Sequence, residues 1–170
     1  MKFKFLISLA LILTIVISSC GTKDEELVAP KGMRYFDISN TGMNLNILIP
    51  DATVGMLDTA MKSWGAYEIK VGKNFQISIE EGDGDIEMVK ADIGNDEVNK
   101  LKRYLIQEPT TLVWESGIAD IKEFHFYHIT KIGTRSYVIH NIKEEVFSQE
   151  VIAKMLEAAK QVKEIKKIQA

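Results

Sequence analysis

Alternation of apolar and polar residues recurs along much of this chain and restricts its fold more than any other feature. From Met33 onward the segments MRYFDI and MNLNILI flank SNTG, in which Asn40 and Gly42 favour a turn. A strand with an apolar side chain at every second position has one face that can be buried. Residues 33–49 are therefore predicted to form a β-hairpin.

The same alternation predicts five further strands. AYEIKV and FQISIEE surround a turn at residues 72–74 and are predicted to form a second hairpin. TTLVWES, EFHFYHITKI and RSYVIHNI are predicted to form a three-strand meander, with the last two strands joined across Gly133 and Thr134. Residues 53–62 fit either a short helix or a long loop.

Two interior segments carry helical spacing instead. Residues 86–93 place apolar side chains at helical intervals, and Asp85 precedes them at a capping position. A firmer helix is predicted from about Asp96 to Gln107, with Asn95 as its cap, because this segment combines an apolar face with a basic one. The apolar face consists of Val98, Leu101 and Leu105.

A third helix is predicted to close the chain. Ser148 stands at its capping position, and apolar residues cover about half of the circumference as far as Val162. Lys163 and Lys166 then fall on the apolar side, so the residues up to Ala170 are predicted to form a frayed basic tail. Its lysines would complement the helix dipole or contact an anionic membrane.

Together these elements predict an α+β fold in which about seven strands form one antiparallel sheet packed by helices. Residues 33–170 are enough for a single globular domain with a hydrophobic core. The chain has one cysteine, Cys20, so the domain contains no disulfide and no thiolate metal site.

Cys20 lies at the end of an N-terminal signal. Two lysines precede an apolar run of 13 residues, Phe5 to Ile17, and two serines follow it. This order is typical of a secretory signal peptide, here residues 1–19, and the run is shorter than the ~20 residues that span a bilayer. Ile17-Ser18-Ser19-Cys20 resembles the bacterial lipobox, which implies cleavage before Cys20 and acylation of its thiol.

Residues 20–32 are predicted to form a lipidated, flexible tether. Gly21 takes the place of the aspartate that would resemble an inner-membrane retention signal, which favours the outer membrane. Lys23-Asp24-Glu25-Glu26 is similar to a surface-export signal and equally fits a solvated linker. The expected location is the bacterial cell envelope, at the periplasmic side of the outer membrane or at the cell surface.

The charge balance argues against nucleic acid as a partner. Removal of the signal peptide would leave 19 of the 21 basic residues against 24 acidic ones, a formal charge of −5. Binding of nucleic acid calls for a basic patch, which a mildly acidic domain does not predict. The expected contact with the membrane is through the acylated Cys20.

The order of the predicted elements resembles the PsbP/DcrB-like fold: paired N-terminal strands, an interior lysine-rich helix, a three-strand meander and a closing helix of the form FSQEVIAKMLEAAKQV. DEVNKLKRYLIQEP, EFHFYHI and MLEAAKQVK are also similar to segments of a group of small envelope lipoproteins. The resemblance covers roughly residues 33–165. It implies an accessory or binding module, since that fold commonly assists larger assemblies.

The histidines are not predicted to form a metal site. His125 and His128 are three positions apart in a predicted strand, so their side chains point to opposite faces. His140, on the next strand, could lie across from one of them and give a two-histidine pair with Glu123 nearby.

A calcium loop is not predicted either. Asp83, Asp85 and Glu87 alternate as at the start of such a loop. Met88 and Gly94, however, stand where an EF-hand requires glycine and glutamate. A solvated turn is the better interpretation of this segment.

No catalytic signature and no cofactor motif occurs in the sequence, because GxSxG and a phosphate-binding glycine loop are both absent. We therefore expect a non-enzymatic envelope lipoprotein whose domain binds a partner protein. A small-ligand carrier is the alternative, with Trp64 lining the edge of its binding surface. A hydrolase built from dispersed carboxylates and histidines is a third hypothesis.

Overall fold

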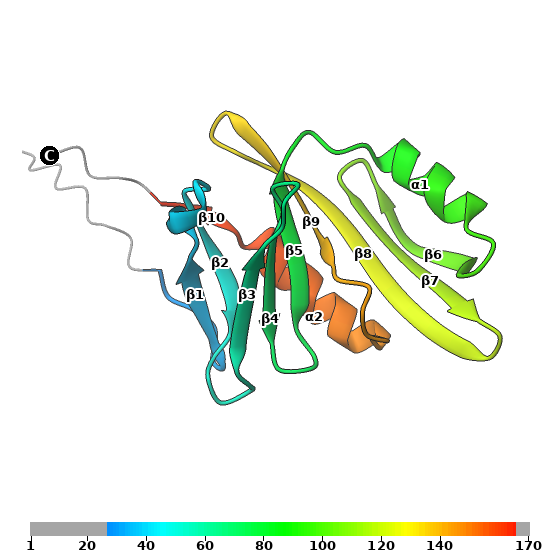
Figure 1. The fold of residues 1–170 in the computed structure, drawn as a ribbon, viewed down its shortest axis with the longest axis horizontal. Helices are drawn as coiled ribbons and strands as arrows, with labels where there is room; N and C mark the ends of the chain where they lie inside the picture. Colours follow the sequence, from blue (N-terminus) through cyan, green and yellow to red (C-terminus); the bar gives the residue numbers. More distant parts are fainter. Residues whose placement is uncertain (1–26, 166–170) are drawn as a thin grey trace, which may run out of the picture.

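The computed structural model describes residues 27–165, which form an α+β fold of two antiparallel sheets and two α-helices (Figure 1). Several predictions concern residues outside this range: the signal peptide, the acylation of Cys20, and the basic side chains of Lys166 and Lys167. Within residues 27–165, neither helix combines the length and the apolar character that a membrane crossing requires.

The strands of the larger sheet are β3 (Leu57–Met61), β4 (Tyr67–Val71), β5 (Gln76–Glu81), β6 (Lys100–Glu108), β7 (Thr111–Ile118), β8 (Ile121–Ile132) and β9 (Arg135–Asn141). They lie in the order β3-β4-β5-β9-β8-β7-β6. The smaller sheet has the order β1-β2-β10. It consists of β1 (Met33–Asp37), β2 (Leu45–Pro50) and β10 (Lys163–Glu164). The helices are the 3₁₀ turn η1 (Ser39–Thr41), α1 (Ile86–Asn95) and α2 (Gln149–Lys160).

Both predicted hairpins and the predicted meander are confirmed: β1 pairs with β2, β4 with β5, and β7, β8 and β9 follow one another. The prediction of a single sheet is wrong. Strand β2 is buried on both faces, since Leu45, Ile47, Leu48 and Ile49 are all at most 2% exposed. Such a strand packs face to face against the larger sheet, and within residues 27–165 no ladder joins the two sheets.

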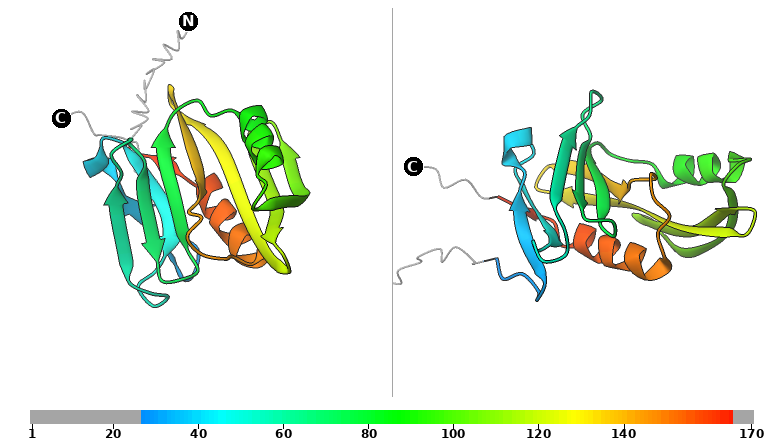
Figure 2. Two further views of the ribbon diagram at one scale, coloured as in Figure 1. Left: turned by 45° about the vertical axis from the view of Figure 1, so that its right-hand side comes forward. Right: turned by 60° about the horizontal axis from the view of Figure 1, so that its bottom comes forward.

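The main core lies on one face of the larger sheet, where α2 and β2 contact each other (Figure 2). Ile152 and Met155 of α2 are fully buried there, together with isoleucines of β2, β4, β5 and β9. Ser148 caps α2 as predicted, because its Oγ accepts a hydrogen bond from the Val151 N–H at 3.3 Å. Burial of this apolar face, at about 25 cal/mol per Å², is the main stabilising contribution.

Helix α1 covers the opposite face at the β6–β8 end of the sheet. The side chains of β7 show the separation directly, since Val113 joins the main core while Leu112 and Trp114 pack beneath α1. Asp85 caps α1 as predicted, and its Oδ1 accepts from the N–H groups of Glu87 and Met88. Asp85 therefore serves the helix rather than a calcium loop.

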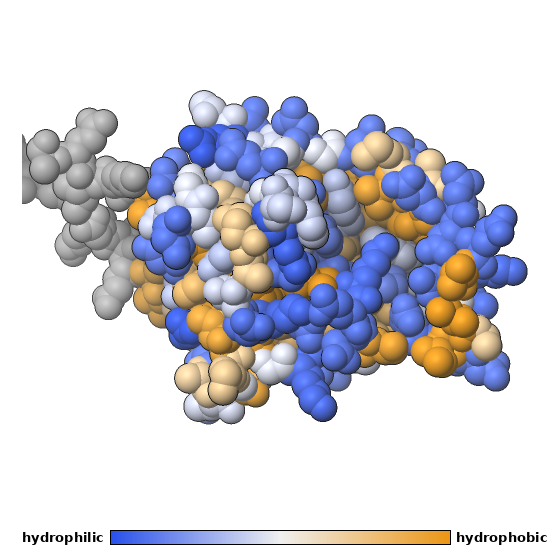
Figure 3. Space-filling view, viewed as in Figure 1, coloured by the Kyte–Doolittle hydropathy of each residue, from blue (hydrophilic) through white to orange (hydrophobic). Residues whose placement is uncertain are grey.

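The rest of that face is polar. Glu68, Ser78, His140 and Tyr127 form a row across β4, β5, β9 and β8. Lys62 and Lys70 contribute ion pairs, to Glu68 and Glu144 respectively. Figure 3 shows hydrophilic residues over much of the middle of this face. The larger sheet is thus apolar on the α2 side and polar between α1 and the β3 edge.

The prediction of a helix at residues 96–107 is wrong. Helix α1 ends at Asn95, and β6 runs from Lys100 to Glu108, paired with β7. Two register shifts in this pairing, between Leu101 and Arg103 and between Tyr104 and Ile106, break the two-residue period of the strand. The apolar residues therefore recur at three- and four-residue intervals, which mimics a helix.

The predictions for residues 53–62 and for the C-terminal tail also need correction. Residues 57–61 are strand β3, whose last four residues are exposed, so no alternation marked it. After α2, Lys163 and Glu164 form β10 on the edge of β2 instead of a frayed tail. The edge of β2 offers unpaired backbone groups, and Ile165 N–H also donates to the Asn44 carbonyl at 2.9 Å.

Candidate functional site

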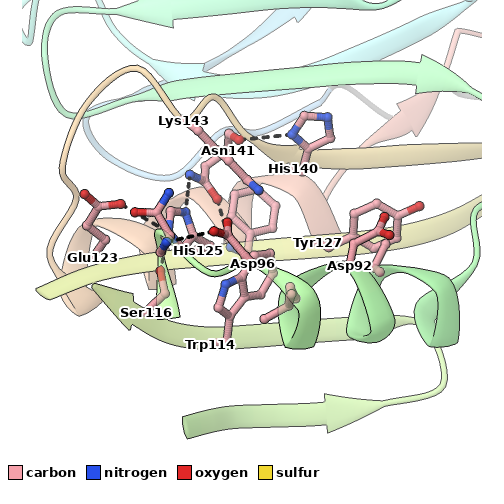
Figure 4. Close-up of a pocket in the computed structure, with 14 residues that line it drawn as sticks. Asp92, Asp96, Trp114, Ser116, Glu123, His125, Tyr127, His140, Asn141 and Lys143 are labelled. Carbon is pink, nitrogen blue, oxygen red and sulfur yellow. Dashed lines mark hydrogen bonds and ion pairs between the residues drawn. The ribbon is translucent and has the colours of Figure 1, made fainter. Parts of the chain in front are cut away.

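A pocket of about 330 Å³ lies between α1 and the β7–β9 meander (Figure 4). The pocket exists because β9 is shorter than β8. The two strands pair only from Tyr127 of β8, which lies opposite His140 near the end of β9. Residues 121–126 of β8 therefore have no β9 partner on that side. The side chains around this opening come from all three strands, from α1 and from the loops after α1 and β9.

Asn141 replaces the missing ladder contact at this point. Its side-chain Oδ1 accepts a hydrogen bond from the Phe126 N–H at 2.9 Å, and the residue is only 1% exposed. Its Nδ2 lies 3.3 Å from the Ile142 carbonyl oxygen and 3.3 Å from His125 Nδ1. These contacts together orient the amide, so Nδ2 is a donor to both acceptors.

The orientation of Asn141 assigns the tautomer of His125. Because Asn141 Nδ2 donates, His125 Nδ1 must be the unprotonated nitrogen, and Nε2 carries the proton. Nε2 lies 3.0 Å from Ser116 Oγ, to which it donates. The ring also packs against Trp114 with 5.1 Å between ring centroids.

His125 is uncharged near neutral pH. Its pKa is lowered to about 4, mainly by burial and to a smaller extent by the positive charge of Lys143, while Asp96 opposes both effects. Glu123 Oε2 lies 3.6 Å from Nε2, so the two groups are close without forming an ion pair between charges at pH 7.

The Ser116–His125 pair is arranged for structure rather than for nucleophilic catalysis. An activated serine needs an unprotonated nitrogen of the histidine as its proton acceptor. Here the histidine donates and Ser116 Oγ accepts, which is the reverse of that arrangement. The geometry favours a fixed polar surface for binding over acyl transfer.

Charged groups surround this fixed surface. Asp96 Oδ1 accepts hydrogen bonds from the N–H groups of Asn99 at 2.8 Å and Val98 at 2.9 Å. These backbone hydrogen bonds lower the pKa of Asp96, with a smaller contribution from Lys143. Lys143 Nζ lies 5.8 Å from the centre of the Trp114 ring, within the range of a cation–π interaction.

Two further acceptors belong to residues that line the pocket. Asn99 Oδ1 has no hydrogen-bond partner within residues 27–165, and it is buried from solvent and therefore from a ligand. His140 Nδ1 lies 3.0 Å from the Asn141 carbonyl oxygen, to which its N–H donates, so Nε2 is left as an acceptor in the neutral ring. The His140 ring stacks on Tyr127, with an interplanar angle of 10°.

The histidines lie partly as the sequence predicts. His125 and His128 point to opposite faces of β8, and His128 Nδ1 lies 2.9 Å from Thr111 Oγ1 in a buried pair. His140 is opposite Tyr127 rather than opposite a histidine, although His125, His140 and Glu123 line the same pocket. In the chain from residue 27 to 165, no cluster of three or more histidine, cysteine or acidic side chains fits a metal ion.

Trp64 lies in the turn between β3 and β4, is 69% exposed, and is not among the residues that line this pocket. Sequence reasoning missed Trp114, Ser116, Asn141 and Lys143. Alternation does place Trp114 and Ser116 on the same face of β7, and in the structure His125 of β8 lies on that same face of the sheet, directly opposite Trp114. The register that brings them together depends on the tight turn between Ile118 and Ile121, which the sequence pattern did not define.

No protein-family model, curated protein or solved structure compared with this chain matches it. The function is therefore inferred from the pocket and from the sequence, without a relative to supply a substrate or a partner.

Proposed function

We propose that this chain is a lipid-anchored, non-enzymatic protein of the bacterial cell envelope whose pocket between α1 and β7–β9 binds a small polar molecule. The observation that carries the proposal is the buried network of His125, Ser116 and Asn141 beside the Trp114 ring. Few, fixed polar groups beside aromatic walls are typical of small-molecule sites, and about 330 Å³ is within their usual size range.

The non-enzymatic part of the proposal is supported by the direction of the hydrogen bonds. His125 Nε2 donates to Ser116, and its neighbours hold that tautomer. A hydrolase that used Ser116 as its nucleophile would need the opposite proton position. Binding without chemistry is what this arrangement favours.

The envelope location is supported by the sequence alone. The signal-peptide pattern, the lipobox-like residues 17–20 and the tether make an outer-membrane lipoprotein the preferred location. Residues 27–32 form no helix or strand, which fits the predicted spacer between Cys20 and the domain.

The PsbP/DcrB-like fold remains part of the proposal. Its support is the order of the N-terminal hairpin β1–β2, the β7–β9 meander and the closing helix α2. The interior helix of this order is α1, at residues 86–95. The segment in which the sequence predicted that helix, residues 96–107, contains strand β6 instead. A fold of this kind would suit a binding or accessory role, although fold and function are separable.

Fluorescence of Trp114 tests the binding proposal. The chain contains two tryptophans, so in a Trp64→Phe variant Trp114 is the only one and reports on the pocket. Fractions of small polar metabolites should include one that changes the Trp114 emission. The same fraction should have a weaker effect when Ser116→Val fills part of the pocket with apolar atoms. If no fraction changes the emission, the binding proposal is wrong.

Partner binding, the first expectation from the sequence, has a specific observation in its favour. Strand β3 is an edge of the larger sheet, and its surroundings expose Met56 (87%), Met61 (50%) and Trp64 (69%). An exposed edge with apolar side chains is a usual site for an added strand or a docked protein. A photo-crosslinker at position 64 should capture an envelope protein that the same group at Lys90 on α1 does not. Identical products from both positions would contradict this role.

A further inference from the structure

The pocket that we propose as a ligand site has an excess of negative charge. Asp92, Asp96 and Glu123 contribute three carboxylates to its lining, and Lys143 contributes one ammonium group. Figure 4 shows Asp92 and Asp96 at α1 and its C-terminal end, and Lys143 beyond the end of β9. An acidic recess bounded by low-dielectric walls raises the local concentration of cations.

The hydrogen-bonding groups of the pocket point to the same charge. Its fixed donors are already used, since His125 Nε2–H donates to Ser116 and the Asn141 amide donates to Ile142 and His125. Its remaining groups are the carboxylates of Asp92 and Glu123, which accept hydrogen bonds, and the indole N–H of Trp114, which is a donor. The backbone hydrogen bonds from Val98 and Asn99 to Asp96 Oδ1 hold the charge of this carboxylate at the edge of the pocket.

An ammonium group already lies on the aromatic wall of the pocket. Lys143 Nζ is 5.8 Å from the centre of the Trp114 ring, and the lysine follows β9 on an exposed loop. A flexible lysine chain can leave this position at little cost, because no carboxylate lies within 4.0 Å of its Nζ in the described part of the chain. The face of Trp114 can thus bind a cation, and in this structure the ammonium group of Lys143 lies there.

From these three observations we infer that the ligand is a small organic amine in its ammonium form, and that Lys143 takes the position of this ammonium on Trp114. An ammonium has three donors and no acceptor, which matches the three carboxylates of Asp92, Asp96 and Glu123 that line the pocket. This inference rests on the proposed binding function and adds the chemical class of the ligand. It also assigns Lys143 as a competitor for the ligand rather than a contact that holds it.

The test compares three probes of the same length and different charge. Cadaverine is a diamine of five carbons, glutarate a dicarboxylate of five carbons, and 1,5-pentanediol is neutral. Each is titrated into the full-length chain carrying Trp64→Phe, in neutral detergent micelles, and the emission of Trp114 is recorded. We expect cadaverine to bind and the other two probes not to.

Variants of single charges then identify the site. Lys143→Gln should tighten cadaverine binding about fivefold to tenfold, the equivalent of one cation–π or close charge interaction. Asp96→Asn should weaken it by a similar factor while keeping an Oδ1 acceptor for the turn. Lys90→Gln is the matched control: it removes one positive charge from α1, where Lys90 pairs with Glu87 outside the pocket, and should change nothing.

Two results would overturn the inference while leaving the proposed function intact. If glutarate binds the parent chain, and binds the Lys143→Gln variant more weakly, the pocket is an anion site in which Lys143 contacts the ligand. Pentanediol that binds as well as cadaverine would show that charge is not recognised. Cadaverine that fails to bind Lys143→Gln, or that binds it no better than the parent chain, would also refute the assigned role of Lys143.

Discussion

At the scale of single residues, His125 makes the domain sensitive to acid. Burial, helped by Lys143, lowers its pKa from 6.5 to about 4. In the unfolded chain this histidine takes up a proton near pH 6.5, whereas in the folded protein it does so only near pH 4. The folded state therefore loses stability as the pH falls through this window, by ~1.4 kcal/mol per pH unit, and His125 has no effect above it.

His125→Gln should remove this dependence. Between pH 6.5 and 5 the free energy of unfolding of the parent chain should fall more steeply than that of the variant, by about 1 kcal/mol per pH unit. Urea denaturation at several pH values measures both slopes. His128, whose pKa burial also lowers, stays in both proteins and contributes equally to them. Equal slopes would contradict the burial of His125 as a neutral ring.

Asn141 is the residue that sets the proton position of the pocket. Asn141→Asp would place a carboxylate beside His125 Nδ1, now 3.3 Å from the amide nitrogen. A carboxylate there stabilises the imidazolium, so the pKa of His125 should rise. The chemical shift of the His125 Cε1 proton, followed by NMR during a pH titration, measures the change. An unchanged pKa would contradict the close contact between the side chain of residue 141 and His125 Nδ1.

At the scale of elements, the β7–β8 hairpin depends on Gly117. A Cβ atom at this position would lie 2.1 Å from the Ile121 carbonyl oxygen, so the backbone of the hairpin would have to move. Gly117→Ala should therefore destabilise the protein by about 1–3 kcal/mol, as overpacking does. Gly94→Ala is the matched control, because nothing lies within 4 Å of its Cβ position in α1. That variant should be stabilised by about 0.4–1 kcal/mol. Urea denaturation compares the two, and a neutral Gly117→Ala would contradict the close approach.

The elements also show what the sequence could and could not predict. Both hairpins, the meander and α2 were predictable because apolar and polar residues alternate cleanly or follow one helical face. Strand β6 was not, because its two register shifts send Leu101 to the cluster beneath α1 and Leu105 to the main core. Of the site, the faces of His125 and His128 followed from periodicity. The contact between His125, Ser116 and Asn141 required the strand register and the early end of β9.

At the scale of the whole molecule, stability and binding are on different faces. The main core, on the α2 side, includes residues of both sheets, whereas the pocket lies on the α1 side with a small apolar cluster of its own. In Figure 1 the chain that leads into β1 lies at the end of the molecule away from α1. A domain anchored through Cys20 by a flexible tether would be free to turn, so its pocket could face away from the membrane. The tether from Cys20 to Met33 could extend up to about 45 Å.

Loss of Cys20 tests this whole arrangement in the cell. Cys20→Ala removes the proposed acylated thiol, and each buried methylene of an acyl chain contributes ~0.8 kcal/mol to membrane binding. Without it we expect an unprocessed or soluble precursor that incorporates no labelled fatty acid. Fractionation of cells grown with labelled palmitate measures both properties, and Trp64→Phe, which keeps the cysteine, is the control expected to stay acylated and membrane-bound. A Cys20→Ala protein that still carries label and still sediments with the membranes would refute the lipid anchor. A pocket that binds its ligand equally well in the soluble form would then show that the binding function does not depend on the anchor.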